Sequence, residues 1–152
     1  MADIKSNAQK IKVTPIEVSL NLVNDKLHFI GKTGARVPID LDYIPPHGDN
    51  LGYMPLELFL ISFGTCAASS ILVLLRKMGK IITGMDVIAK GVRRDVHPTC
   101  FETITLEFFL KSSDVDKASF DKAVAMSEES ICPVWAMVKN NVQIVVEYTI
   151  IP

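Results

Sequence analysis

Two cysteines stand at positions where a fold could bring reactive sulfur together. Cys66 lies at the middle of an uncharged apolar stretch of 18 residues, Leu58 to Leu75. Cys132 opens a later segment, Cys-Pro-Val-Trp, 66 positions further along the chain. A cysteine in an apolar helix is most often a small hydrophobic residue, since burial raises the thiol pKa and leaves the sulfur inert. Reactivity therefore depends on whether these two sulfurs meet.

The position of Cys132 favours a thiolate. It stands at or next to the start of a predicted helix, with Pro133 in the first turn. Free backbone N–H groups and the helix dipole favour an anion there, which is a recurring way of lowering a thiol pKa. The alternative is a buried residue at the helix start. As a dithiol, the pair could reduce a peroxide. One thiolate would attack a peroxide oxygen, releasing an alcohol and becoming a sulfenic acid, and the second thiol would condense with that sulfenic acid to form a disulfide.

Such chemistry needs a cation to hold the thiolate and a carboxylate to orient the cation. Glu57 precedes Cys66 by nine positions, or two and a half helical turns, so the two side chains point in opposite directions. Glu57 would reach a cysteine only across a dimer or if the helix start bends. Cys100 has no assigned role. Candidate cations, each more often a solvated side chain, are Arg36, Arg93, Arg94 and His97.

Composition and charge exclude several classes of protein. The chain has 152 residues, about half of them apolar, and a net charge of -1, which gives no electrostatic reason to expect nucleic acid or an anionic membrane as a partner. We expect a loose polar arm over 1–10 and one domain over 11–152. The arm lacks the apolar core of a signal peptide, so a cytoplasmic protein is expected. Without paired Cys or His spacing, no metal site and no cofactor are expected.

The apolar stretch has two interpretations. Its 18 residues reach the lower end of the length that spans a membrane. Small and polar residues at its middle lower its hydrophobicity, and Pro55 and Glu57 suit the start of an ordinary helix. A buried core helix is therefore favoured over a membrane span. Because this helix is apolar on nearly all sides, a second subunit is expected to cover part of it.

Periodicity and turn residues predict an α+β fold. The small residues 64–69 would let another backbone, often a helix, approach closely. Strands that arrive in hairpins favour antiparallel pairing. The predicted elements are strands at 11–23, 26–30 and 36–41, a loop at 42–54, a long helix at 55–78, strands at 81–92 and 101–111, helices at 115–129 and from Cys132-Pro133 to about 140, and a strand at 142–150.

Three runs in this order and spacing resemble the OsmC/Ohr family over about residues 28 to 150. They are Pro55–Leu60 followed by Gly64-Thr65-Cys66, then Arg94–Pro98, then Ser127–Val134. The resemblance implies an intertwined α+β homodimer, with antiparallel sheets around the long helix and two sites at the interface. It also implies reduction of organic hydroperoxides, and less efficiently hydrogen peroxide, at the expense of a dithiol reductant.

By the same resemblance, Cys66 is the peroxidatic thiol and Cys132 the resolving thiol. In the best studied branch, an acid directly follows the motif's proline and pairs with an arginine from the β-meander turn. Here Leu56 has that place and Glu57 comes one later, as in a broader OsmC-like branch, while Arg36 lies near the expected arginine. The missing acid also supports a second hypothesis, a non-enzymatic protein that binds a small apolar or thiol compound in the interface pocket.

Overall fold

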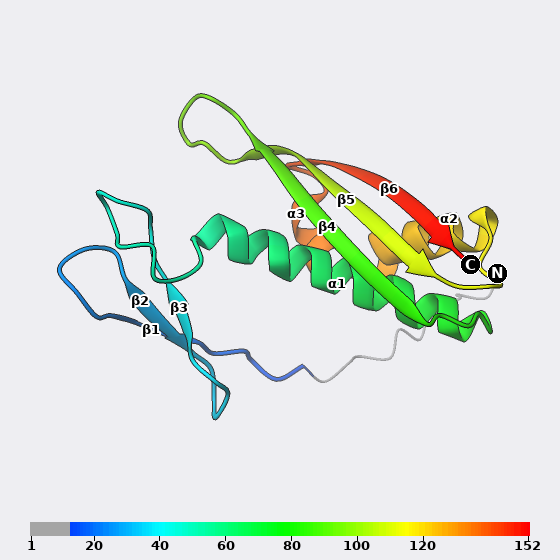
Figure 1. Ribbon diagram of the computed structural model, residues 1–152, viewed down its shortest axis with the longest axis horizontal. Helices are drawn as coiled ribbons and strands as arrows, with labels where there is room; N and C mark the ends of the chain where they lie inside the picture. The colour runs from blue at the N-terminus through cyan, green and yellow to red at the C-terminus, as the bar shows by residue number, and fades with distance from the viewer. Residues whose placement is uncertain (1–12) are drawn as a thin grey trace, which may run out of the picture. The chain divides into compact units, whose positions relative to one another are not determined.

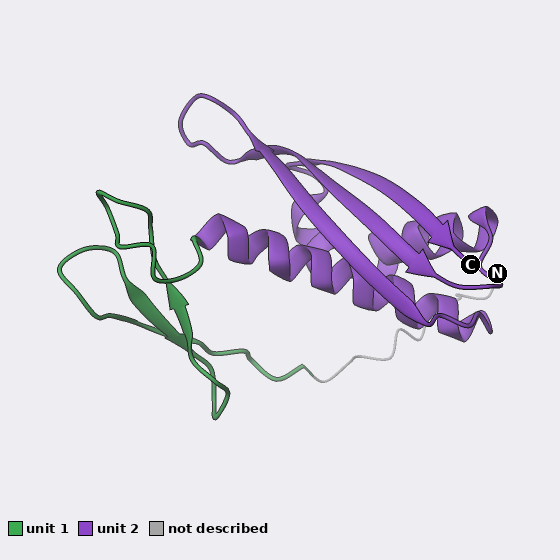
Figure 2. Cartoon of the chain, viewed as in Figure 1, with its two compact units in different colours: residues 1–54 green, residues 55–152 purple. Residues whose placement is uncertain are grey.

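The computed structural model describes residues 13–152, and the chain divides into two compact units, residues 1–54 and 55–152 (Figure 2). The predicted arm at 1–10 and the first residues of the predicted strand 11–23 lie outside the described residues. The single domain over 11–152 stays a prediction.

The first unit contains the predicted β-meander. Strands β1 (Ser19–Leu22), β2 (Phe29–Lys32) and β3 (Ile39–Leu41) pair antiparallel in sequence order. The first turn is built by the Asn24 side chain, which accepts hydrogen bonds from the backbone N–H groups of Lys26 and His28. The first strand is much shorter than the predicted 11–23.

A buried carboxylate organises the loop that follows the meander. The Asp42 side chain is 1% exposed and accepts backbone hydrogen bonds from Tyr43, Asp49 and Leu51 at 2.8, 3.0 and 3.1 Å. Burial acts to raise the Asp42 pKa, but the three N–H donors stabilise the charged form and the pKa is lowered overall. The predicted loop 42–54 is therefore an ordered structure folded around one charge.

The second unit packs helices on a three-stranded sheet (Figure 1). Strand β5 buries every second side chain, which is the period expected of a strand with one covered face. The elements are α1 (Pro55–Lys77), β4 (Gly84–Arg93), β5 (Phe101–Lys111), α2 (Lys117–Met126), the π-helix η1 (Ser127–Ile131), α3 (Pro133–Val138) and β6 (Gln143–Ile151).

The α+β class is confirmed, but antiparallel pairing throughout is wrong for the last strand. Strand β4 pairs antiparallel with β5, whereas β6 pairs parallel with β5. A parallel neighbour requires a long crossover, and α2, η1 and α3 supply it between β5 and β6. The prediction of antiparallel hairpins holds for the strands up to β5. It fails for β6, because three helices separate β6 from β5 in the sequence.

Helix α1 presents one apolar face to the core. This face packs against β4, α2 and α3. Gly64 lies opposite the Ala89 side chain of β4, so the element that approaches this small residue is a strand rather than another helix. By length and composition α1 is also apolar enough to cross a membrane, and about one third of its most apolar window is buried inside the chain. The buried residues of α1 are Phe63, Gly64, Ala67, Ser70, Ile71, Leu74 and Leu75.

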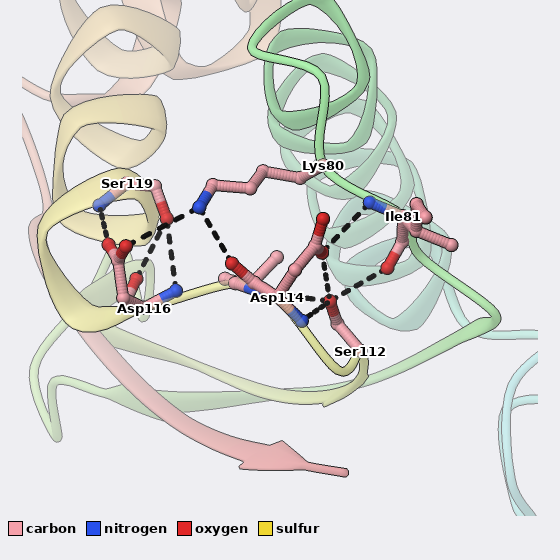
Figure 3. A network of polar contacts seen from close by, with 7 residues as sticks. Lys80, Ile81, Ser112, Asp114, Asp116 and Ser119 are labelled. Atoms are coloured by element: carbon pink, nitrogen blue, oxygen red, sulfur yellow. Dashed lines mark hydrogen bonds and ion pairs between the residues drawn. The ribbon is translucent and has the colours of Figure 1, made fainter.

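The end of α1 is joined to the start of α2 by a polar network (Figure 3). Gly79 adopts φ 78° and ends α1. Lys80 then donates through Nζ to the Asp114 carbonyl at 2.6 Å. Asp116 caps α2 by accepting from the Ser119 N–H at 2.7 Å, while the Asp116 N–H donates to the Ser119 hydroxyl. These contacts fix α2 relative to α1, and α2 leads directly into the segment that carries Cys132.

Candidate functional site

The two predicted cysteines meet. The Cys132 thiol lies 3.0 Å from the sulfur of Cys66, and both cysteines are free. A disulfide bond is about 2.05 Å long, so bond formation requires the sulfurs to approach by about 1 Å. Cys66 is half-buried, whereas Cys132 is only 2% exposed. The arrangement is an asymmetric dithiol in which Cys66 is the more exposed residue.

Local structure explains why Cys132 points at α1. The π-helix η1 ends where the Cys132 N–H donates to the Ser127 carbonyl at 2.9 Å. Cys132 is then the N-cap of α3, and its sulfur accepts a hydrogen bond from the Trp135 N–H at 3.4 Å. Pro133 takes the first helical position, where its missing N–H costs nothing. One turn of π-helix, a frequent feature of functional sites, thus aims the sulfur at Cys66.

Of the two interpretations of Cys132, the structure favours the buried residue at a helix start over a thiol with a lowered pKa. Burial raises the pKa of the Cys132 thiol, and its hydrogen bond with the Cys66 sulfur raises it further. The Trp135 N–H and the Ser70 hydroxyl act in the opposite direction, but they do not offset burial. Cys132 is therefore held as a neutral thiol at neutral pH, which suits a group that reacts second.

Two serines that the sequence analysis did not single out lie beside the sulfurs. Ser70 and Ser127 are 7% and 0% exposed, and the Ser127 hydroxyl donates to the Ser70 hydroxyl at 3.1 Å. The Ser70 hydroxyl donates in turn to the Cys66 carbonyl at 2.6 Å. A possible signal was present in the sequence, since Ser70 interrupts the apolar stretch and Ser127 begins the run that ends in Cys132.

Two buried aromatic side chains pack against each other close to Cys132 in the chain fold. Trp135, the one tryptophan of the chain, is 1% exposed and meets the ring of Phe63 edge to face at 5.7 Å. Its indole N–H has no hydrogen-bond partner among residues 13–152. Because this tryptophan also donates its backbone N–H to Cys132, its fluorescence is placed to report on the state of the sulfurs.

The structure does not bring Glu57 to Cys66 within one chain. Glu57 is exposed in the first turn of α1, which runs unbroken from Pro55 to Lys77. Nine residues of helix separate the two positions by about 13 Å along the axis. Arg36 lies in the first unit, in the turn before β3, where its side chain is exposed and its N–H donates to the Thr33 carbonyl at 3.2 Å.

The remaining candidate cations lie in the β4–β5 hairpin. The guanidinium of Arg93 donates to the Thr99 carbonyl at 2.6 Å, and that of Arg94 donates to the Pro98 carbonyl. Both arginines therefore hold their own turn. His97 and Cys100 are both exposed in the same connection. Across residues 13–152, no group of three or more His, Cys, Asp or Glu side chains is placed to hold a metal ion.

Solved structures share this fold. The crystal structure of a hypothetical protein from Aquifex aeolicus VF5 superposes with a TM-score of 0.78 at 27% identity, covering 91% of this chain and 98% of that one. An OsmC-like protein from Mycoplasma pneumoniae gives 0.78 at 15% identity, with 91% and 99% covered. The organic hydroperoxide resistance protein OhrB of Bacillus subtilis gives 0.63 at 16% identity, with 90% and 98% covered.

Sequence comparison gives the same relationship. Protein YhfA of Escherichia coli K12 is 29% identical over 125 residues, which are 82% of this chain and 91% of YhfA. The family model described as OsmC-like protein matches residues 47–147, a span that includes Cys66, Cys132, Ser70 and Ser127. The match extends over well more than half of the chain, so the protein belongs to the OsmC-like family.

Proposed function

We propose that this chain is a thiol peroxidase that reduces organic hydroperoxides, and hydrogen peroxide less efficiently, with Cys66 and Cys132. The Cys66 thiolate attacks the distal peroxide oxygen and becomes a sulfenic acid, and the alcohol leaves after taking up a proton. The Cys132 thiol then condenses with the sulfenic acid, giving a disulfide and water. A dithiol reductant restores both thiols and is itself oxidised to a disulfide.

The single observation that carries the proposal is the 3.0 Å distance between the two sulfurs. The difference in burial supports this order of events, because a peroxide reaches the half-buried Cys66 more easily than the 2% exposed Cys132. Phe63 and Trp135 give the neighbourhood an apolar character that suits an alkyl peroxide. Relatives of the same fold that are named organic hydroperoxide resistance proteins add further support.

The proposal includes a cytoplasmic homodimer. Large apolar side chains of α1 are uncovered within the chain, among them Ile61 at 49% and Val73 at 47% exposure. A second copy would bury them, and it would also offer its own Glu57 and Arg36 as carboxylate and cation for the dithiol. These two residues stay predicted members of the site on that basis.

The direct test is consumption of cumene hydroperoxide by the purified protein with dithiothreitol as reductant. Cys66→Ser should abolish turnover, Cys132→Ser should stop at a Cys66 sulfenic acid that dimedone traps, and Cys100→Ser should behave as wild type. Equal inactivity of wild type and Cys66→Ser toward alkyl hydroperoxides and hydrogen peroxide would refute the peroxidase.

A second candidate function is binding of a small apolar or thiol compound without turnover. The observation in its favour is that, within residues 55–152, neither sulfur accepts a hydrogen bond from a cationic side chain. Mass spectrometry after peroxide treatment separates the two functions. A Cys66–Cys132 disulfide supports the peroxidase, and two free thiols support the binding protein.

A further inference from the structure

Two buried hydroxyls close a ring of contacts around the dithiol. The Ser127 hydroxyl donates to Ser70 and the Ser70 hydroxyl to the Cys66 carbonyl, at 3.1 and 2.6 Å. The Ser127 carbonyl accepts from the Cys132 N–H at 2.9 Å, and the sulfurs of Cys132 and Cys66 lie 3.0 Å apart. The ring therefore ties each serine to a cysteine and the two serines to each other.

The Ser70 hydroxyl can change its acceptor. A hydroxyl carries one hydrogen and two lone pairs, and its hydrogen rotates to the better acceptor. Here the hydrogen goes to the Cys66 carbonyl. A serine inside an α-helix commonly donates to the carbonyl one turn earlier, so this bond is an ordinary helix contact. Ser70 lies one helical turn after Cys66, whose sulfur is 3.0 Å from that of Cys132, and the Ser70 hydroxyl acts to lower the Cys132 pKa. A negative charge on the Cys132 sulfur would attract the hydrogen.

We propose that the Ser70 hydroxyl, held in place by Ser127, turns to the Cys132 sulfur and stabilises it as the leaving thiolate whenever the Cys66–Cys132 disulfide is reduced. This inference rests on the disulfide cycle proposed above. Ser70 acts on a reacting atom, and Ser127 is a positioning residue that supplies the hydrogen bond Ser70 accepts.

The burial of the two sulfurs sets the direction of reduction. A reductant thiolate attacks the accessible sulfur of Cys66, forming a mixed disulfide there, and the electron pair of the broken S–S bond goes to Cys132. The second thiol of the reductant then attacks the mixed disulfide, releases Cys66 and leaves the reductant as a disulfide. Protons from the reductant end on Cys132 and in solvent. A buried thiolate is costly unless it is hydrogen-bonded. The Trp135 N–H already donates to the Cys132 sulfur, and the Ser70 hydroxyl would be the second donor.

The experiment measures reduction of the disulfide without any peroxide. Diamide oxidises the purified protein, dithiothreitol reduces it, and alkylation with mass spectrometry follows the Cys66–Cys132 bond over pH 6 to 9. Ser70→Ala should slow reduction by about tenfold or more, the scale of a hydrogen bond to a charged group. Ser127→Ala should slow it less. Exposed Ser69 gives the matched control, and Ser69→Ala should reduce at the wild-type rate.

A double variant separates chemistry from stability. Ser70→Ala leaves the buried Ser127 hydroxyl without its acceptor, whereas Ser70→Ala with Ser127→Ala removes both hydroxyls and should recover much of the lost Tm. The proposal requires the Cys66–Cys132 disulfide to be reduced as slowly in the double variant as in Ser70→Ala. It also requires faster reduction in Ser70→Thr, which keeps the hydroxyl, than in Ser70→Ala. A wild-type rate in Ser70→Ala, or a rate that recovers together with the Tm in the double variant, overturns it.

The outcome is independent of the peroxidase test. A wild-type protein that forms the disulfide with diamide but not with any peroxide refutes the proposed function and leaves the role of Ser70 to be decided by the reduction rates. Failure of diamide to link Cys66 and Cys132 in wild type overturns both.

Discussion

The sulfurs of Cys66 and Cys132 lie 3.0 Å apart, yet Cys66 is half-buried and Cys132 is only 2% exposed. Contact between two thiols with such different surroundings makes their reactivities unequal before any substrate binds. Burial and the contact with Cys66 both raise the pKa of Cys132, so its thiolate population at neutral pH is small. The asymmetry is a property of the reduced protein itself and can be measured without a peroxide.

Alkylation should therefore label the cysteines at different rates. At pH 7, iodoacetamide should modify Cys132 at least about tenfold more slowly than exposed Cys100, since Cys132 is both buried and poor in thiolate. The alkylation rate of Cys132 should rise as the pH approaches its raised pKa, because the reactive thiolate forms only in that pH range. Peptide mass spectrometry of timed samples measures each site, and labelling in urea gives the reference in which all three sites react alike. Equal native rates at Cys132 and Cys100 would contradict the buried neutral thiol.

A series of arginine substitutions can identify the cation that stabilises the Cys66 thiolate. Arg93 and Arg94 already donate to carbonyls of their own hairpin, so Arg93→Ala and Arg94→Ala should leave kcat/KM for cumene hydroperoxide within about twofold of wild type. Arg36→Ala should lower it by about tenfold or more, because a charge-assisted hydrogen bond to the Cys66 thiolate would be lost. Steady-state assays with the Tm of each variant as control make the comparison. If kcat/KM fell only in an Arg93 or Arg94 variant with a normal Tm, the cation that holds the thiolate would belong to the β4–β5 hairpin instead.

Much of the second unit could be predicted from the sequence because its signals are local. Pro55 and Gly79 bracket the apolar run, and the predicted helix 55–78 differs from α1 by one residue. The parallel pairing of β6 could not be predicted the same way, because it depends on where the α2–α3 crossover delivers the chain. Two cysteines 66 positions apart were a plausible dithiol from the sequence, but their contact is a tertiary fact.

The chemistry around the dithiol was less predictable than its members. The position of Cys132 at a helix start was correct, but the sequence left the direction of its pKa open, because burial depends on the packing of Trp135 and α1 rather than on the cap. Ser70 and Ser127 gave only a weak signal, since serine is common in helices and a hydroxyl becomes informative only when its burial is known. Contacts between distant segments, and not residue types, decide these features.

Two glycines of the second unit should respond oppositely to a methyl group. A Cβ at Gly64 would lie 3.5 Å from the Ala89 Cβ, an ordinary contact, so Gly64→Ala should stabilise by about 0.5–1 kcal/mol through helix propensity. At Gly91 a Cβ would lie 2.2 Å from Cε1 of Phe101, so Gly91→Ala should destabilise by about 1–3 kcal/mol through overpacking. Urea unfolding of both variants provides the test, and a stability loss in Gly64→Ala would show that α1 and β4 approach more closely than the structure has them.

The buried carboxylate of Asp42 should make the stability of the first unit depend on pH. Its folded-state pKa is lowered, since three backbone N–H donors outweigh the effect of burial. A lowered pKa means that the unfolded chain takes up the proton first. The stabilisation is therefore complete above the unfolded pKa of about 3.9 and is lost as pH falls through the folded value.

Asp42→Asn keeps the shape of the side chain but offers the three donors one acceptor oxygen and no charge. It should unfold at lower urea concentration than wild type at pH 7, and the difference should shrink as pH falls below about 4, because wild type then loses the same charge. Exposed Asp25 supplies the control, and Asp25→Asn should follow the wild-type pH profile. Urea midpoints at a series of pH values, followed by circular dichroism, decide the matter. A difference between Asp42→Asn and wild type that stays constant from pH 7 to pH 2 would mean that the carboxylate charge does not hold the loop.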